Sequence, residues 1–212
     1  MDVTIIGTGN MAQGIGTRLV AGGHDVTVLG TDAAKAQALA SSLGGSVQAG
    51  TSGTEPLRGD VVVLAVPYAA AADALAPYAD QLAGRVVVDI TNPLNDTFDG
   101  LVTPGDGSGA QEIAAALPEG ARVVKAFNTT FAGTLTAGEV AGQPLDVFVA
   151  GDDDEAKATV SELLASIGFN PVDAGPLALA RAMEGMAVLS MIVETKTNGS
   201  WNDGWKLLRT SG

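Results

Sequence analysis

The first segment whose residue types and spacing could do chemistry is a glycine-rich loop near the N-terminus. It directly follows an apolar run and reads Gly7-Thr8-Gly9-Asn10-Met11-Ala12. In such a loop Gly7 permits a tight turn, Gly9 lets the backbone approach a diphosphate, and Ala12 lets a helix pack closely on a strand. Free N–H groups at the start of the following helix attract the diphosphate. The motif predicts a dinucleotide site; the alternative is a tight structural turn.

The residues after the second predicted strand bear on which nicotinamide cofactor binds. An acidic residue there binds the ribose 2′-hydroxyl of NAD, whereas a nearby cation accepts the 2′-phosphate of NADP. Gly30 leaves room for a bulky group, Thr31 offers a hydroxyl, and Lys35 follows one helical turn later. Asp32 is either a ribose ligand or only the N-cap of the next helix. The residues alone leave NADP and NAD both open.

Three further predicted strands end in residues that could contact a cofactor. These residues are Ala65, Val66, Pro67 and Tyr68; then Asn92 and Pro93; then Asn128 and Thr129. Because ligands of open α/β sheets bind at the carboxyl ends of the strands, we expect these residues near the ribose, the nicotinamide or a second ring. Tyr68 could instead be a packing residue at a helix start, and Asn128 and Thr129 could form a turn or a helix cap.

Short β-rich runs alternate with alanine-rich helical stretches along most of the chain. Strands are predicted at Val3–Gly7, Asp25–Leu29, Ser46–Ala49, Asp60–Val66, Gly84–Ile90, Arg122–Phe127, Leu145–Ala150 and Asn170–Ala174. Helices are predicted at Asn10–Ala21, Asp32–Leu43, Tyr68–Tyr78, Gly109–Leu117, Asp153–Ile167, Leu177–Thr195 and Ser200–Leu208. This alternation predicts an α/β protein of the Rossmann type, doubly wound, with a mainly parallel sheet.

The chain divides, on this interpretation, into a dinucleotide-binding domain at 1–175 and a small C-terminal helical region at 176–212. A long loop, Thr91–Ser108, interrupts the first part, and such loops are functional more often than accidental. In the C-terminal region, Trp201 and Trp205 are spaced to share a helix face. The methionines of the preceding helix, Met191 among them, favour core or dimer packing over contact with a cofactor ring.

Composition excludes several classes of function. The 212 residues are 46% apolar, enough for one sizeable core, and the apolar runs are too short to span a membrane. Without cysteine there is no disulfide, thiolate nucleophile or zinc–sulfur site. A net charge of −13 with only 11 lysines and arginines opposes nucleic acid binding. We expect a cytoplasmic protein with small-molecule partners, no metal site and no catalytic side chain; a homodimer stays open.

Several segments resemble the family of coenzyme F420-dependent NADP oxidoreductases. They are the Gly7–Met11 loop, Val62–Tyr68, Lys125–Thr129, Gly151–Glu155 and Asp173–Leu177, within a resemblance that spans residues 1 to about 185. The resemblance implies hydride transfer between NADP(H), bound at the glycine loop, and the deazaflavin coenzyme F420, bound in a cleft against the C-terminal helices. The two cofactors would carry the chemistry, so no general base is required.

The chain departs from the family pattern at two positions. Thr31 stands where members commonly carry an arginine for the 2′-phosphate, so Lys35 would have to compensate. Asn128 stands where some members have histidine; asparagine can hydrogen-bond a carboxamide or a deazaflavin carbonyl but cannot shuttle a proton. Two alternatives remain open at this point: an NAD(P)H-dependent reductase of a flavin or a small carbonyl or imine, and a non-catalytic NAD(P)-binding domain.

Overall fold

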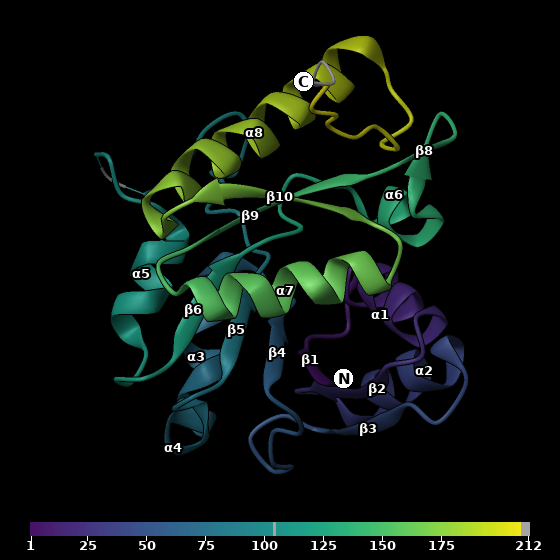
Figure 1. Cartoon of the computed structure of the whole chain (residues 1–212), viewed down its shortest axis with the longest axis vertical. Helices are drawn as coiled ribbons and strands as arrows, with labels where there is room; N and C mark the ends of the chain where they lie inside the picture. Colours follow the sequence, from purple (N-terminus) through teal and green to yellow (C-terminus); the bar gives the residue numbers. More distant parts are fainter. Residues whose placement is uncertain (104, 209–212) are drawn as a thin grey trace.

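An eight-stranded sheet forms the centre of the structure (Figure 1). The computed structural model describes residues 1–103 and 105–208. The strands are β1 (Asp2–Ile6), β2 (Asp25–Gly30), β3 (Gln48–Thr51), β4 (Val61–Leu64), β5 (Val86–Asp89), β6 (Arg122–Lys125), β9 (Asp146–Gly151) and β10 (Asn170–Gly175). Their order across the sheet is β10-β9-β6-β5-β4-β1-β2-β3. All neighbours run parallel except β6 and β9, which confirms the predicted mainly parallel, Rossmann-type sheet.

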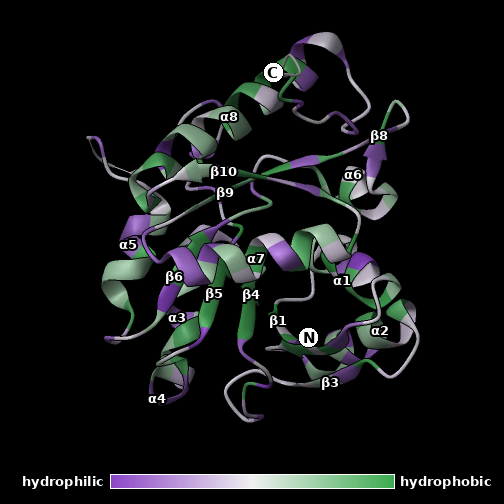
Figure 2. Cartoon of the chain, viewed as in Figure 1, coloured by the Kyte–Doolittle hydropathy of each residue, from purple (hydrophilic) through white to green (hydrophobic). Residues whose placement is uncertain are grey.

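Helices cover both faces of this sheet and bury two apolar clusters against it. The helices are α1 (Asn10–Ala21), α2 (Ala33–Leu43), α3 (Ala71–Leu75), α4 (Ala79–Leu82), α5 (Gly109–Ala116), α6 (Ala132–Ala137), α7 (Asp154–Ser166) and α8 (Ala180–Thr197). The central strands β4 and β5 consist mostly of valine and are fully buried, as expected for parallel strands covered on both faces (Figure 2). None of the helices in the described residues is long and apolar enough to cross a bilayer.

The strand order reverses between β1 and β4. From β1 the chain winds outward through β2 to β3, then returns to the other side of β1 to form β4. The loops after β1 and β4 therefore leave the sheet in opposite directions and open a crevice between them. The glycine loop and residues 65–68 occupy these two positions.

Three sequence-based expectations differ from the structure. The helix expected at Tyr68–Tyr78 is broken into short helical turns, because Pro77 lacks the N–H that a continuous helix needs. Helix α6 and a small hairpin, β7 (Glu139–Val140) with β8 (Gln143–Pro144), lie where no element was predicted. The prediction of a helix at Ser200–Leu208 is wrong, because the segment has no regular secondary structure.

The C-terminal segment 200–208 is instead an irregular strap along the molecule. Asn198, with a φ of 55°, ends α8 and turns the chain back. The backbone N–H of Leu207 and the ammonium of Lys206 both bind Asp146, each at 2.7 Å. Trp205 donates to Ser190 of α8 at 2.9 Å, so Trp201 and Trp205 do not share a helix face. The last four residues of the expected C-terminal region, 209–212, lie outside the described residues.

A buried ionic cluster fixes α8 and α5 to the sheet. The ammonium of Lys125 on β6 lies 2.8 Å from Asp89 of β5 and 3.1 Å from Glu184 of α8, and all three side chains are 0% exposed. Lys125 also donates to the carbonyl of Thr91. The carboxylate of Glu184 accepts the backbone N–H groups of Gly109 and Ala110 at the start of α5, at 3.2 and 3.3 Å. Every charge is thus paired or hydrogen-bonded, the condition under which buried ions are tolerated.

We predict that Lys125→Met destabilises the protein by about 3–5 kcal/mol, because it leaves two buried carboxylates without their cation. Urea unfolding measures this change. Lys196→Met, at an exposed position on α8, is the matched control and should change the free energy of unfolding little. Equal midpoints for the two variants would contradict the role given to the cluster.

We also predict a pH-dependent contribution from the C-terminal strap. Burial, and next the neighbouring charge of Glu194, raise the pKa of Asp203 above its ordinary value. The folded state then binds the proton more tightly than the unfolded chain. Stability therefore falls as pH rises from the ordinary pKa of an aspartate towards the raised pKa of Asp203 in the folded state. Asp203→Asn should raise Tm by about 1–3 °C at pH 7, with the gain disappearing below the ordinary pKa of about 3.9. Asp106→Asn, an exposed position, should show no such pH-dependent gain.

Candidate functional site

Gly7 is required by close contact with the neighbouring strand end. Its φ is 129°, and a Cβ there would lie 2.0 Å from the carbonyl oxygen of Ala65. The Gly7 N–H also donates to the carbonyl of Leu29 at 2.8 Å. No other residue fits this turn without moving β4, so Gly7 has a structural role and brings the loops after β1 and β4 together.

Gly9 has the opposite surroundings. Its φ is −86°, which any residue adopts, and a Cβ there would meet nothing within 4 Å. Gly9 is also the N-cap residue of α1, a helix with no acidic residue in its first turn. The free N–H groups and the positive end of the helix dipole therefore face open space, into which a diphosphate can come close.

A groove follows the carboxyl edge of the sheet in three contiguous parts. The outer pocket, about 240 Å³, is bordered by Gly7, Thr8, Gly30, Thr31 and Ser52, among others. The central cleft, about 660 Å³, is bordered by Asn10, Tyr68, Thr91, Phe98 and Val102, among others. The inner pocket, about 220 Å³, is bordered by Asn128, Thr129, Thr130, Phe131, Ala132, Ala187, Ser190 and others. Neighbouring parts share lining residues: the outer pocket and the cleft share Gly9, Ala65, Val66 and Pro67, and the cleft and the inner pocket share Met11, Ile90 and Asn92.

The structure brings fourteen of the sixteen candidate residues into this groove. They are Gly7, Thr8, Gly9, Asn10, Met11, Gly30, Thr31, Ala65, Val66, Pro67, Tyr68, Asn92, Asn128 and Thr129. The other two do not line it. Lys35 is exposed on α2, and Pro93 is buried against the start of α5, where a Cβ on Gly109 would lie 3.2 Å from the Pro93 ring.

Asp32 is the N-cap of α2. Its carboxylate accepts the N–H groups of Ala34 and Lys35 at 2.9 and 3.2 Å. Of the two interpretations open from the sequence, the structure supports the cap.

Tyr68 links the central cleft to α5. Its hydroxyl donates to Glu112, and its ring lies against Gly109, where a Cβ would be 3.0 Å from the ring. Burial, and next the hydrogen bond to Glu112, raise the pKa of Tyr68 to about 12. The phenol stays protonated at physiological pH, so Tyr68 cannot serve as a general base.

The family resemblance implied a cleft against the C-terminal helices, but the residues that wall the inner pocket were not predicted as site residues. Phe131 and Ala132 follow the buried strand β6 at the start of an unpredicted helix, and Ala187, Ser190 and Met191 come from α8. Contact between α8 and the strand ends depends on tertiary packing, which periodicity does not reveal. The buried cluster of Lys125, Asp89 and Glu184 was missed for the same reason, although a lysine within an apolar strand was a visible signal.

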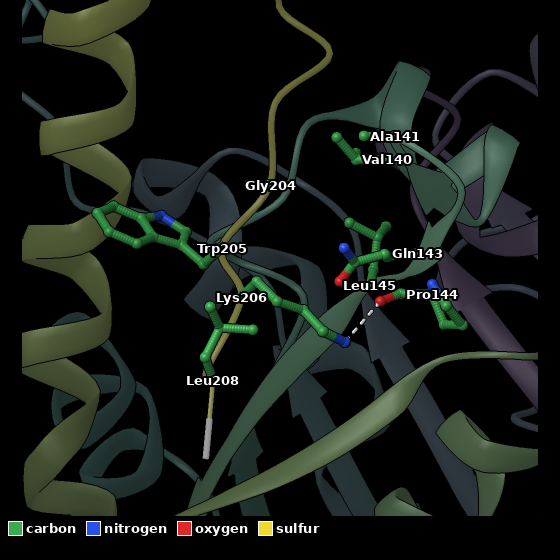
Figure 3. A pocket seen from close by; sticks show the side chains of 9 residues that line it. All are labelled: Val140, Ala141, Gln143, Pro144, Leu145, Gly204, Trp205, Lys206 and Leu208. Carbon is green, nitrogen blue, oxygen red and sulfur yellow. Dashed lines mark hydrogen bonds between the residues drawn. The ribbon is translucent and has the colours of Figure 1, made fainter. Parts of the chain in front are cut away.

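A separate cavity of about 250 Å³ lies between the β7–β8 hairpin and the C-terminal strap (Figure 3). Its lining includes Val140, Leu145 and Trp205, and Lys206 crosses it to the carbonyl of Pro144 at 3.0 Å. It shares no lining residue with the groove and holds no acid–base pair. We assign it to the packing of the strap.

The groove has the features of a dinucleotide site. The glycine loop lies at the switch point of a Rossmann-type sheet, a helix N-terminus faces open space, and a long cleft continues past it. Across the described residues, no lysine, arginine, aspartate or glutamate lines its three parts. No cluster of three metal-ligating side chains occurs in the part of the chain that the structure describes. These observations define a Rossmann-type fold with a groove of the kind that binds dinucleotides in such folds.

Comparison with known proteins identifies the family. The family model described as NADP oxidoreductase, coenzyme F420-dependent, matches residues 2–93. The F420-dependent NADP reductase of Methanothermobacter thermautotrophicus is 34% identical over 200 residues, which cover 87% of this chain and 85% of that protein. The chain therefore belongs to the F420-dependent NADP oxidoreductase family, whose members are NADP-dependent oxidoreductases.

Two further similarities extend this comparison. A crystal structure from Arthrobacter sp. FB24, provisionally named an F420-dependent NADP reductase, superposes with a TM-score of 0.85 at 28% identity and covers 98% of this chain and 99% of that one. The metalloreductase STEAP3 of Rattus norvegicus is 35% identical over 182 residues, which are 86% of this chain. The matched region is only 35% of STEAP3, so this chain corresponds to about a third of that protein.

The two loop glycines should respond differently to substitution. Gly9→Val should weaken NADPH binding about 100-fold or more, equivalent to about 3 kcal/mol, and leave Tm nearly unchanged, because its side chain enters only the space meant for the ligand. Gly7→Val should lower Tm strongly, because its side chain meets the Ala65 carbonyl. Titration of NADPH by fluorescence, with thermal melts of both variants, tests this pair. NADPH affinity that survives Gly9→Val would refute the phosphate-loop assignment.

Proposed function

We propose that this protein transfers hydride between NADP(H) and the deazaflavin coenzyme F420. The observation that carries the proposal is the groove's length: it continues past the glycine loop into an inner pocket walled by α6 and α8. A dinucleotide occupies the outer pocket and the cleft, and the inner pocket leaves room for part of a second ring. The 34% identity to an F420-dependent NADP reductase supports deazaflavin as that ring.

The residues present fit NADP. N–H groups around Gly9 would hold the diphosphate, since a Cβ there meets no atom of the protein. Gly30, Thr31 and Ser52 would surround the adenosine ribose in the outer pocket. Asp32 caps α2 through its Oδ1, and Lys35 supplies the cation nearest in sequence for a 2′-phosphate. We therefore propose NADP as the preferred cofactor, with NAD the weaker ligand.

The chemistry needs little from the protein's side chains. When bound, NADPH supplies a hydride from its nicotinamide ring. The groove's task is to hold two rings in contact and to exclude water, and its wall of Met11, Ile90 and Phe131 is suited to this. On this proposal residues 1–175 bind the dinucleotide, and α8 in the C-terminal region completes the site for the second ring.

An NADPH-dependent reductase with an acceptor other than F420 is the second candidate. The similarity to a metalloreductase over 86% of this chain favours it, since that relative's name points to a metal as the acceptor. The match to the metalloreductase covers about a third of that protein, however, whereas the match to the F420-dependent NADP reductase covers 85% of that protein. The deazaflavin is therefore the first choice.

The deciding experiment mixes the protein with NADPH or NADH and oxidised F420, and follows deazaflavin absorbance. We expect turnover with F420, faster with NADPH than with NADH. Ala132→Phe fills the inner pocket and should lower turnover about 10- to 100-fold, in line with the cost of about 1–3 kcal/mol for a steric mismatch in an apolar substrate pocket, without weakening NADPH binding. Ala137→Phe, on the exposed side of the same short helix, is the control and should keep full turnover.

Other outcomes distinguish the alternatives. Turnover with free flavin but not with F420 would replace the deazaflavin by a flavin as the acceptor. NADPH binding without turnover on any of these acceptors would make the chain a non-catalytic nucleotide-binding domain. Equal turnover for both alanine variants would remove the inner pocket from the site.

A further inference from the structure

The two walls of the inner pocket come from helices that pack on different neighbours. One wall is Phe131 and Ala132 at the start of α6, and the other is Ala187, Ser190 and Met191 of α8. Helix α6 packs mainly against α1, whereas α8 packs mainly against α5. The distance between the walls therefore depends on what joins α6 to α8.

The C-terminal strap makes contact with both of these helices. In Figure 1 it leaves the end of α8, reaches towards α6 and turns back to α8. On the α6 side, the hydroxyl of Thr134 donates to the backbone carbonyl of Asp203 at 3.1 Å. On the α8 side, the indole N–H of Trp205 donates to Ser190 at 2.9 Å, and Figure 3 shows this indole turned towards α8. Because Ser190 lines the pocket, the strap is bonded directly to one of the two walls.

Trp201 of the strap contacts the opposite wall. Its ring centroid lies 5.3 Å from that of Phe131, and the ring planes meet at 76°, the edge-to-face arrangement that aromatic pairs prefer. The described residues that line the pocket include Phe131 but not Trp201. Trp201 can therefore influence a ligand in the pocket only through Phe131.

The backbone of Trp201 is strained. Its φ is 57°, in the left-handed region that bulky side chains rarely adopt. The side chain is 46% exposed, so burial compensates for this strain only in part. The carboxylate of Glu194 on α8 holds the conformation by accepting the backbone N–H of Trp201 at 2.5 Å. Strain that the surrounding structure maintains is typical of functional sites, and here it places the indole against Phe131.

We propose that Trp201 is a positioning residue that holds Phe131 in place as a wall of the inner pocket. Trp205 anchors the same strap to Ser190 of the opposite wall, so the strap sets the distance between the two walls. This inference rests on the proposed function for the ligand, a flat ring in the inner pocket. A flat ring binds well only where both faces meet apolar walls. The strap therefore controls affinity for the ring and leaves affinity for the dinucleotide unchanged.

The test measures ring binding without turnover. Dissociation constants of 5-deazariboflavin and of riboflavin are measured by calorimetry in the presence of saturating NADP⁺, and the affinity for NADP⁺ is measured separately. Trp201→Ala should weaken binding of each ring that the wild type binds by about 3- to 10-fold, the ratio that an edge-to-face ring pair can supply. The affinity for NADP⁺ should stay within about twofold of the wild type on the same argument. Trp201→Phe retains an aromatic ring and should restore most of the lost affinity.

A double-mutant cycle separates positioning from a general loss of stability. Phe131→Ala removes the wall itself and should weaken ring binding. Adding Trp201→Ala to that variant should cause no further loss, because the contact between the two side chains is already absent. Leu39→Ala, at a buried position of α2, is the control: it should lower Tm and leave ring affinity unchanged. Should Trp201→Ala fail to fold, Trp201→Leu takes its place in the cycle.

Four results would overturn the proposal: full ring affinity in Trp201→Ala, an equal loss of NADP⁺ affinity, the same loss with and without Phe131, or a wild type that binds neither ring. The measurements need no turnover, so they separate this inference from the proposed reaction. Ring affinity that depends on Trp201, without F420 reduction, would reject the reaction and keep the positioning role. F420 reduction by a protein whose ring affinity does not depend on Trp201 would do the reverse.

Discussion

The ion cluster around Lys125 is the interaction on which the functional site depends. Lys125 joins β6 to β5 through Asp89 and to α8 through Glu184, and Glu184 in turn holds the first two N–H groups of α5. A Rossmann sheet alone provides a phosphate loop and an open edge. The inner pocket exists only because α8 lies across that edge, and the cluster sets its position. If one of the three side chains is replaced by an apolar one, a charge on its partner is left unpaired in the apolar interior. The three side chains therefore depend on one another.

The two glycines of the phosphate loop lack a side chain for different reasons. Gly7 lies where a Cβ would collide with the backbone of Ala65, so this glycine serves the contact between β1 and β4. Gly9, two residues later, has ordinary backbone angles and no neighbour, so only a ligand gives a reason for its missing side chain. Sequence patterns treat the two glycines alike, whereas in the structure Gly7 is constrained by its neighbours and Gly9, proposed to approach the diphosphate, is not.

Much of the fold could be predicted from local patterns, and the failures have identifiable causes. Helix α1 begins at Asn10 and ends at Ala21 as predicted, because a glycine stands at each end. The strap at 200–208 was predicted to be a helix because its two tryptophans are spaced as on a helix face. In the structure the indole N–H of Trp205 donates to Ser190 and the backbone N–H of Leu207 donates to Asp146, and both acceptors are distant in sequence. Candidate residues at strand ends could be predicted because parallel strands share an edge. The α8 residues that wall the inner pocket could not be identified from local patterns, because long-range packing places them; only the family resemblance implied a cleft against the C-terminal helices.

Electrostatics adds a last constraint on how this chain can bind anionic cofactors. The protein carries a net charge of −13, and within the described residues no charged side chain lines the groove. The global field opposes a dinucleotide, so attraction must come from short-range sources: the N–H groups and dipole at the start of α1. The strength of such contacts depends on how closely the diphosphate approaches the N–H groups, and not only on its charge. Diphosphate affinity should therefore depend more on the open space at Gly9 in this protein than in a basic protein, where surface cations attract the diphosphate from a distance.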